Sequence, residues 1–276
     1  MKFAIKSIVA ATAFVAAGMA NAAIVTIDGV ASPGDQFTVS GNGALTFSSL
    51  LRSALNTGRV TASAYGDAVA NITGPAGSYT SLTFGAPIKS ISYDTDTGLV
   101  TRVITSGGAR QVAGFVEGVS FGGWVEVGEL DVRFNAAGTG AEIFGNVIGR
   151  SDAGTAVNFV GQKLFDVAGF TARVNGVNTT FPPVVGDVGF RVGTANTTLN
   201  GLAITDAAFS AISTALELDG LGEAALRAAA RNFGNINSTL TVSQVPVTPA
   251  IPEPSTYALM GLGLVGLALA RRRAAK

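Results

Sequence analysis

Apolar and polar residues alternate most clearly along residues 123–134. The apolar members of this alternation are Val125, Val127, Leu130, Val132 and Phe134. A period of two places alternate side chains of a strand on a buried face and on a wet face. Polar and glycine residues follow over 135–140, and a second apolar series then runs from Ala141 to Ile148. The pattern predicts an antiparallel hairpin.

Other short apolar runs, each bounded by Gly, Pro, Asn or Asp, predict further strands along the chain. They cover residues 23–27, 43–47, 60–64, 82–84, 90–93, 99–105, 162–166, 169–174, 188–192, 197–204 and 236–245. Between two of these runs, Leu50, Leu51 and Leu55 are spaced for one face of one or two helical turns over 48–55. The series as a whole predicts a mainly β domain, either an antiparallel sandwich or a barrel-like fold.

The period changes near the C-terminal end of this domain, where two short helices are expected. Thr205 is placed to cap the first helix, and Phe209, Ile212 and Leu216 then share one face. The second helix is expected over residues 221–232.

The N-terminal residues are typical of a secretory signal peptide. Lys2 and Lys6 precede an apolar run over 7–19, and Ala20 and Ala22 follow with one residue between them. A basic start, an apolar centre and a small-x-small end are the features that signal peptidase recognises. We therefore expect cleavage after Ala22, which would release residues 1–22.

The C-terminal residues combine three features. A proline-punctuated linker over 246–254 ends in Pro252, Glu253 and Pro254, and proline breaks both helix and strand because it fixes φ and lacks an N–H. The uncharged run 257–270 is shorter than the about 20 residues that a bilayer core requires. Three arginines follow this run and favour a cytoplasmic C-terminus. They are Arg271, Arg272 and Arg273.

This arrangement resembles the PEP-CTERM sorting signal of Gram-negative bacteria, apart from Ile251 where valine is common. In that family exosortase, a membrane-embedded transpeptidase, recognises the Pro-Glu-Pro element. The processed proteins reach the cell surface or extracellular matrix, commonly with exopolysaccharide. The resemblance implies export across the inner membrane and transient anchoring through 257–270. The alternatives are a permanent tail anchor and a buried core helix.

We therefore expect four parts in the chain. They are a signal peptide over 1–22, a β-rich extracellular domain over 23–245, the linker and motif over 246–254, and a sorting helix with a basic tail over 255–276.

The extracellular part also resembles a recurrent ectodomain of PEP-CTERM proteins, although this resemblance implies no activity. It rests on residues 105–108, 122–125, 129–132, 201–205 and 236–240. The order of strands followed by helices is similar to that of extracellular bacterial haem-transport domains, which leaves haem as an alternative ligand.

Composition excludes several classes of function. The chain has 18 basic and 18 acidic residues, of which 12 basic and 17 acidic remain in residues 23–250. Because the basic residues form no patch there, nucleic acid is not an expected partner. The chain contains no Cys and no His, which excludes Ser-His-Asp triads and the usual Cys/His zinc sites. We expect no cofactor, no metal and no enzymatic activity.

Two groups of carboxylates have a catalytic or metal-binding alternative. Asp94 and Asp96 begin like a calcium loop, but Gly98 stands where a further ligand is needed, so a hairpin turn is expected. The second group could form the carboxylate pair of a glycosidase, although a solvated strand face explains it more simply. Its members are Glu126, Glu129 and Asp131.

Aromatic residues give a candidate ligand site. Trp124, the only tryptophan, could stack on a sugar ring if it were exposed beside Tyr65, Tyr79 or Tyr93, whereas a buried Trp124 would belong to the core. The same tyrosines could ligate haem iron. Arg227 and Arg231 lie on one side of the second predicted helix. They could form either a solvated face or a clamp for a ligand.

The leading hypothesis is a non-enzymatic surface or matrix protein linked to exopolysaccharide, flocs or biofilm. The alternative is a ligand-binding module, for carbohydrate first and haem second. An enzyme ranks third.

Overall fold

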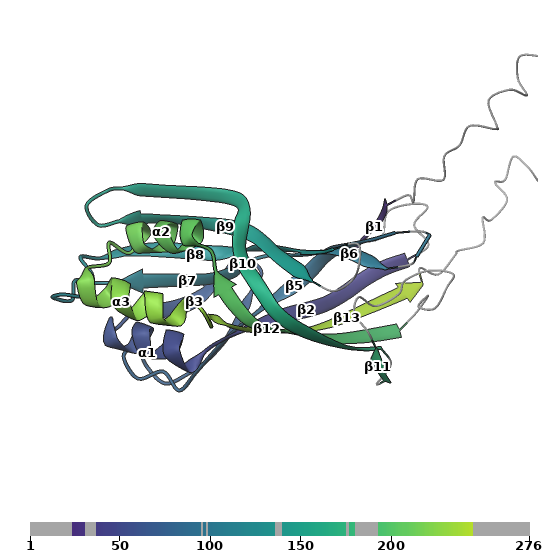
Figure 1. Ribbon diagram of the computed structural model, residues 1–276, viewed down its shortest axis with the longest axis horizontal. Helices are drawn as coiled ribbons and strands as arrows, with labels where there is room; N and C mark the ends of the chain where they lie inside the picture. The colour runs from purple at the N-terminus through teal and green to yellow at the C-terminus, as the bar shows by residue number, and fades with distance from the viewer. Residues whose placement is uncertain are drawn as a thin grey trace, which may run out of the picture. The chain divides into compact units, whose positions relative to one another are not determined.

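The computed structural model describes residues 24–30, 37–94, 96–97, 99–135, 140–174, 177–179 and 193–244 (Figure 1). Within these ranges, thirteen strands belong to one sheet and three helices accompany it. The strands are β1 Ile24–Asp28, β2 Phe37–Phe47, β3 Thr61–Tyr65, β4 Val69–Thr73, β5 Ser81–Asp94, β6 Val100–Thr105, β7 Gly108–Ala113, β8 Gly123–Phe134, β9 Ala141–Ser151, β10 Ala156–Val174, β11 Val177–Thr179, β12 Gly193–Ile204 and β13 Gly234–Gln244. The helices are α1 Ser49–Thr57, α2 Asp206–Ala215 and α3 Gly220–Ala229.

Eight of the strands close into an antiparallel barrel. Their order is β5, β2, β13, β12, β10, β9, β8 and β6, and β6 returns to β5. Closure removes the free edges of a sheet and buries its inner face. Of the two expected forms, sandwich and barrel, the chain therefore adopts the barrel.

The barrel wall branches toward one end. β6 and β7 pair in succession with the same edge of β8, over 131–133 and then 123–128. β3 extends the wall beyond β7, and β4 pairs with the first half of β5. The barrel is therefore wider at the end formed by β3, β4 and β7.

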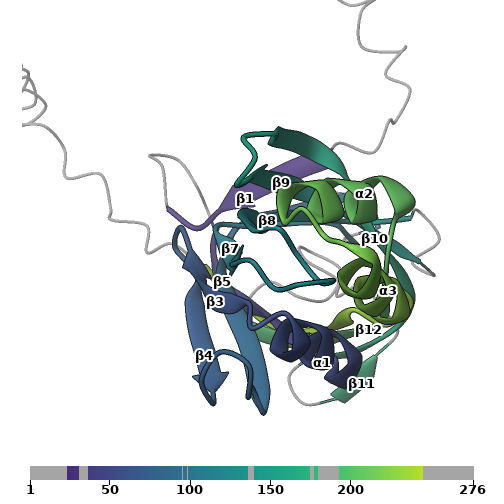
Figure 2. The same ribbon diagram turned by 90° about the vertical axis from the view of Figure 1, so that its left-hand side faces the viewer.

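The three helices cover this wide end, as the end-on view in Figure 2 shows. Ser48 caps α1 through a hydrogen bond from the Leu51 N–H, and Thr205 caps α2 through one from the Ala208 N–H. Both residues satisfy N–H groups that lack a partner inside the helix. The two expected C-terminal helices are confirmed, and the helical turns expected at 48–55 form a third helix.

The opposite end of the barrel contains a second, smaller core. Its buried members include Ile27, Val39, Ile91, Val100 and Val242. β13 runs from Gly234, which pairs with Phe47 just before α1, to Gln244, which pairs with Phe37. The chain therefore leaves the barrel at the end away from the helices (Figure 1).

The predicted hairpin is confirmed as β8 and β9, and its alternation continues across a β-bulge. The register shifts between Gly128 and Asp131, and Glu129 has a φ of 51°. One extra residue in a strand reverses which side chains face inward. The bulge explains how Val127 and Leu130 both point into the barrel.

The other strand predictions differ from the structure at five strands. β4, β7 and β11 were not expected. β5 and β10 are each one strand where two were expected, and β10 has register shifts after Phe159 and Lys163. The strand expected at 188–192 lies outside the described residues.

Candidate functional site

The sorting and cleavage residues lie outside the described part of the chain. They are Ala20, Ala22, Pro252, Glu253, Pro254, Arg271, Arg272 and Arg273. None of the described helices has the length and apolar character needed to cross a membrane. The apolar run 257–270 also falls outside the described residues.

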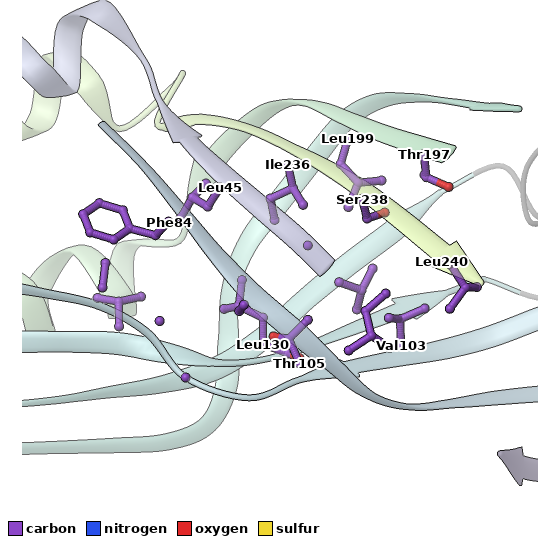
Figure 3. Close-up of a pocket in the computed structure, with 18 of the residues that line it drawn as sticks. Leu45, Phe84, Val103, Thr105, Leu130, Thr197, Leu199, Ile236, Ser238 and Leu240 are labelled. Atoms are coloured by element: carbon purple, nitrogen blue, oxygen red, sulfur yellow. Dashed lines mark hydrogen bonds between the residues drawn. The ribbon is translucent and has the colours of Figure 1, made fainter. Parts of the chain in front are cut away.

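The barrel interior is the first place where a ligand could be held. Side chains from six barrel strands converge there (Figure 3), and they leave a cavity of about 60 Å³. Most of the lining is apolar, with hydroxyls from Thr105, Thr197 and Ser238. Binding sites for organic ligands usually measure about 300–1,000 Å³. The interior is therefore a packed core, as expected where eight strands enclose just enough room for side chains.

Gly43 borders this cavity and gives a test of its size. A Cβ placed there would lie 3.5 Å from Thr105 Cγ2, an ordinary contact. We expect Gly43→Ala to stabilise the protein by about 0.4–1 kcal/mol, because alanine restricts the unfolded chain and fills space in the folded one. Urea unfolding would measure this gain.

Gly41, on the same strand, is the matched control. Its φ is +146°, and a Cβ there would lie 2.0 Å from the Thr239 carbonyl oxygen. Gly41→Ala should therefore be destabilising. Equal losses from both substitutions would contradict an open cavity beside Gly43.

Trp124 and Tyr65 share the outward face of the sheet formed by β3, β7 and β8. Tyr65 pairs with Gly108, and Gly108 pairs with Gly128, which lies four residues from Trp124 on β8. Paired residues of neighbouring strands point to the same face, so Trp124 and Tyr65 lie on one surface. Trp124 is half-buried.

An arginine already occupies the outer side of the Trp124 ring. The Arg110 guanidinium carbon lies 4.6 Å from the ring centroid, and Arg110 Nη1 donates to Glu126 Oε1 at 2.9 Å. A sugar that stacks on Trp124 would have to displace this guanidinium. The face therefore offers polar and aromatic contacts but no open stacking platform.

The other two tyrosines lie elsewhere. Tyr79 is buried, and its hydroxyl accepts a hydrogen bond from the Ala62 N–H at 3.0 Å. Tyr93 packs against the second core at the far end of the barrel. The structure therefore does not bring Tyr93 to Trp124.

The environment of Tyr65 works against iron ligation. Burial, followed by the negative charges of Glu129 and Glu126, raises the pKa of the Tyr65 hydroxyl. A raised pKa disfavours the tyrosinate form at neutral pH. A second cavity, of about 50 Å³, lies beneath the helices. Among the described residues, no tyrosine lines this cavity or the one in the barrel.

The three carboxylates of β8 have separate structural partners. Glu126 pairs with Arg110, and Glu129 Oε1 accepts a hydrogen bond from the Gly107 N–H at 2.7 Å. Asp131 was expected on a solvated face, but only 8% of it is exposed. The sequence prediction was therefore wrong for Asp131.

Two arginines hold Asp131 in its charged form. Arg102 bonds both carboxylate oxygens at 2.6 and 2.8 Å, and Arg133 bonds Oδ2 at 2.9 and 2.7 Å. Burial alone would raise the pKa of Asp131, but the hydrogen bonds from the two arginines outweigh it and lower that pKa. The arrangement gives a stable ion pair rather than a proton donor.

The segment that resembled a calcium loop is a hairpin turn, as expected. Oδ1 of Asp94 accepts hydrogen bonds from the backbone N–H groups of Asp96 and Thr97 at 2.9 and 3.0 Å. The bond from Thr97 is the main reason why the pKa of Asp94 is lowered. β5 and β6 pair on either side of this turn. Within the described residues, no cluster of three or more acidic side chains is arranged to hold a metal ion.

Comparison with known proteins locates the functional signal at the C-terminus. A family model described as the PEP-CTERM protein-sorting motif matches residues 250–273. The match confirms the resemblance of Pro252, Glu253 and Pro254, with the apolar run and arginines after them, to this signal. No curated protein and no solved structure matched the chain.

Proposed function

We propose that this chain is a non-enzymatic surface or matrix protein that associates with the exopolysaccharide of its own cell. The observation that carries the proposal is the sorting motif at 250–273, which implies an exported protein that exosortase sorts. In this proposal signal peptidase removes residues 1–22, and the run 257–270 holds the chain transiently in the inner membrane of a Gram-negative bacterium. The resulting role is in flocs or biofilm.

The chemistry of the domain supports a non-enzymatic role. The chain lacks His and Cys, which supply most general bases and thiol nucleophiles. The carboxylates that invited a glycosidase interpretation, Glu126, Glu129 and Asp131, bond to an arginine, a backbone N–H and two arginines respectively.

The direction of β13 supports a role for the helical end in binding. Any anchor formed on the processed C-terminus would be joined to the barrel through Gln244, which lies at the end opposite the helices. In this proposal the polymer meets the end of the barrel formed by α1, α2 and α3.

The sorting motif can be tested in the producing cell. Pro252→Ala combined with Pro254→Ala should leave a longer, membrane-retained form, because exosortase would lose its recognition element. Immunoblotting of membrane and released fractions would measure the change. The released wild-type protein should begin at Ala23.

Two other prolines in the same linker provide the control. Pro246→Ala with Pro249→Ala removes as many prolines without touching the motif, and processing should continue. If the Pro252/Pro254 variant lost its tail at the normal rate, the motif would not be the signal.

Polymer association has its own test. The processed wild-type protein should co-sediment with exopolysaccharide purified from the same cell, and it should turn over neither glycosides nor esters. Turnover that Glu126→Gln abolished would overturn the non-enzymatic role. A Soret band on haem addition, without polymer binding, would favour haem transport instead.

A carbohydrate-binding module is the second candidate. It is favoured by the shared outward face of Trp124 and Tyr65. In this case Arg110→Ala should strengthen binding, since it uncovers the Trp124 ring.

A further inference from the structure

A polar groove lies between α2 and α3, at the helical end of the barrel. Its volume is about 380 Å³, which falls within the range of sites for small organic ligands. Figure 2 shows the two helices side by side at this end. The groove is lined by Asp206, Phe209, Ser210, Ser213, Thr214, Glu223 and Arg227.

Arg227 is held in a defined position within this groove. Its Nη2 donates to Glu223 Oε1 at 2.8 Å, and its guanidinium carbon lies 4.4 Å from the ring centroid of the buried Phe209. Guanidinium carries five N–H donors on a rigid plane. The stack and the ion pair orient that plane, and 63% of the side chain is exposed, so further donors can reach a ligand.

The wall formed by α2 supplies hydroxyls and a carboxylate. Ser210, Ser213 and Thr214 follow Asp206 at helical spacings of three and four, which places them on one side of the helix. Hydroxyls donate and accept hydrogen bonds, and a carboxylate accepts them. Together with Arg227 they offer the mixture of donors and acceptors that the hydroxyl groups of a sugar require.

The net charge of the groove limits the class of ligand that it can bind. Asp206 and Glu223 face a single cation, Arg227, so the groove carries one net negative charge. This charge disfavours uronic acids and other anionic units. The hydroxyls of Ser210, Ser213 and Thr214 can exchange hydrogen bonds with the uncharged hydroxyl groups of a sugar.

We propose that the groove between α2 and α3 binds a neutral sugar unit of the exopolysaccharide. This inference rests on the function proposed above and names the site that performs it. The groove lies at the helical end of the barrel, opposite the end at which β13 reaches Gln244 (Figure 1).

The test uses the processed protein and oligosaccharides released from the cell's exopolysaccharide by partial acid hydrolysis. Ion exchange separates them into neutral, anionic and cationic fractions, and calorimetric titration measures the affinity for each. Arg227→Ala should weaken binding of the neutral fraction about tenfold or more, because hydrogen bonds to a charged group are lost.

Two further variants separate the groove from the fold. Ser210→Trp, at an exposed position, should block the groove and weaken binding similarly. Arg231→Ala is the matched control, because Arg231 is an exposed arginine just after α3 and is absent from the groove lining. Its affinity should equal that of the wild type, and all variants should keep the wild-type unfolding midpoint within a few degrees.

The outcomes distinguish this inference from the proposed function. If Arg227→Ala and Ser210→Trp bound polymer and oligosaccharides as the wild type does, the groove would be the wrong site and the function would stand. If the wild type bound neither polymer nor oligosaccharides, both proposals would fail. Preference for the anionic or cationic fraction would overturn the neutral class of ligand.

Discussion

Replacing Phe165 with alanine should lower the free energy of unfolding by about 3–5 kcal/mol. Phe165 lies on β10 and is completely buried. Its ring centroid is 5.0 Å from that of Phe233, which in turn lies 5.6 Å from Phe47 beside α1. The substitution would leave a cavity where the barrel wall meets the helices. Because the chain has no cysteine, no disulfide limits the loss.

Urea unfolding followed by the fluorescence of Trp124 would measure this change. Phe115→Ala is the control, because 69% of Phe115 is exposed and it contacts only one other ring among the described residues. Its effect should remain within about 0.5 kcal/mol. Equal, small effects from the two substitutions would contradict a stabilising role for the Phe165 side chain in the core.

The elements that sequence alone predicted are those with a strong local signal. Thr205 caps α2 as expected, and the apolar alternation of β8 continues on both sides of the bulge between Gly128 and Asp131. β7 gave no such signal, since its inward residues are Ala109, Gln111 and Ala113. Two small side chains and a buried glutamine hide the apolar period of this strand.

Barrel closure could not be predicted from the sequence, because it depends on contacts between distant residues. β6 closes the ring by pairing with β8 through only three residue pairs, from Arg102 with Arg133 to Ile104 with Asp131. The local sequence of neither strand indicates which strand it pairs with. Glycine was also misleading in β10, because Gly161 bounded the strand predicted at 162–166. In the structure Gly161 lies within β10 with a φ of 64°, and its N–H donates to Asn146 Oδ1.

Some functional residues also have a local sequence signal, and others depend on contacts between distant residues. The sorting motif is contiguous in sequence, so it was found directly and the family comparison confirmed it. Glu223 and Arg227 could be paired from their spacing of four, but Asp206 joins them only through the packing of α2 against α3. The role of Asp131 was missed because Arg102 is 29 residues away along the chain.

Asp131→Asn should lower the free energy of unfolding by about 1–3 kcal/mol at pH 7. The substitution removes the charge that two arginines share and leaves Arg102 and Arg133 facing each other across neighbouring strands. Asp166→Asn is the control, because Asp166 forms a surface pair with Lys163 and 62% of its side chain is exposed. Exposed pairs contribute little, so that variant should lie within about 0.5 kcal/mol of the wild type.

The difference between wild type and Asp131→Asn should also depend on pH. The pKa of Asp131 is lowered in the folded protein, so folding favours the charged form. Its contribution is complete above the pKa of an unfolded aspartate, about 4, and is lost as the pH falls through the lower, folded value. Urea unfolding at intervals from pH 3 to pH 8 should therefore show a constant difference from pH 5 to pH 8 that shrinks below about pH 4. Other carboxylates titrate in both proteins and cancel in the comparison. A difference that stayed the same down to pH 3 would mean that the charge on Asp131 does not stabilise the junction of β6 and β8.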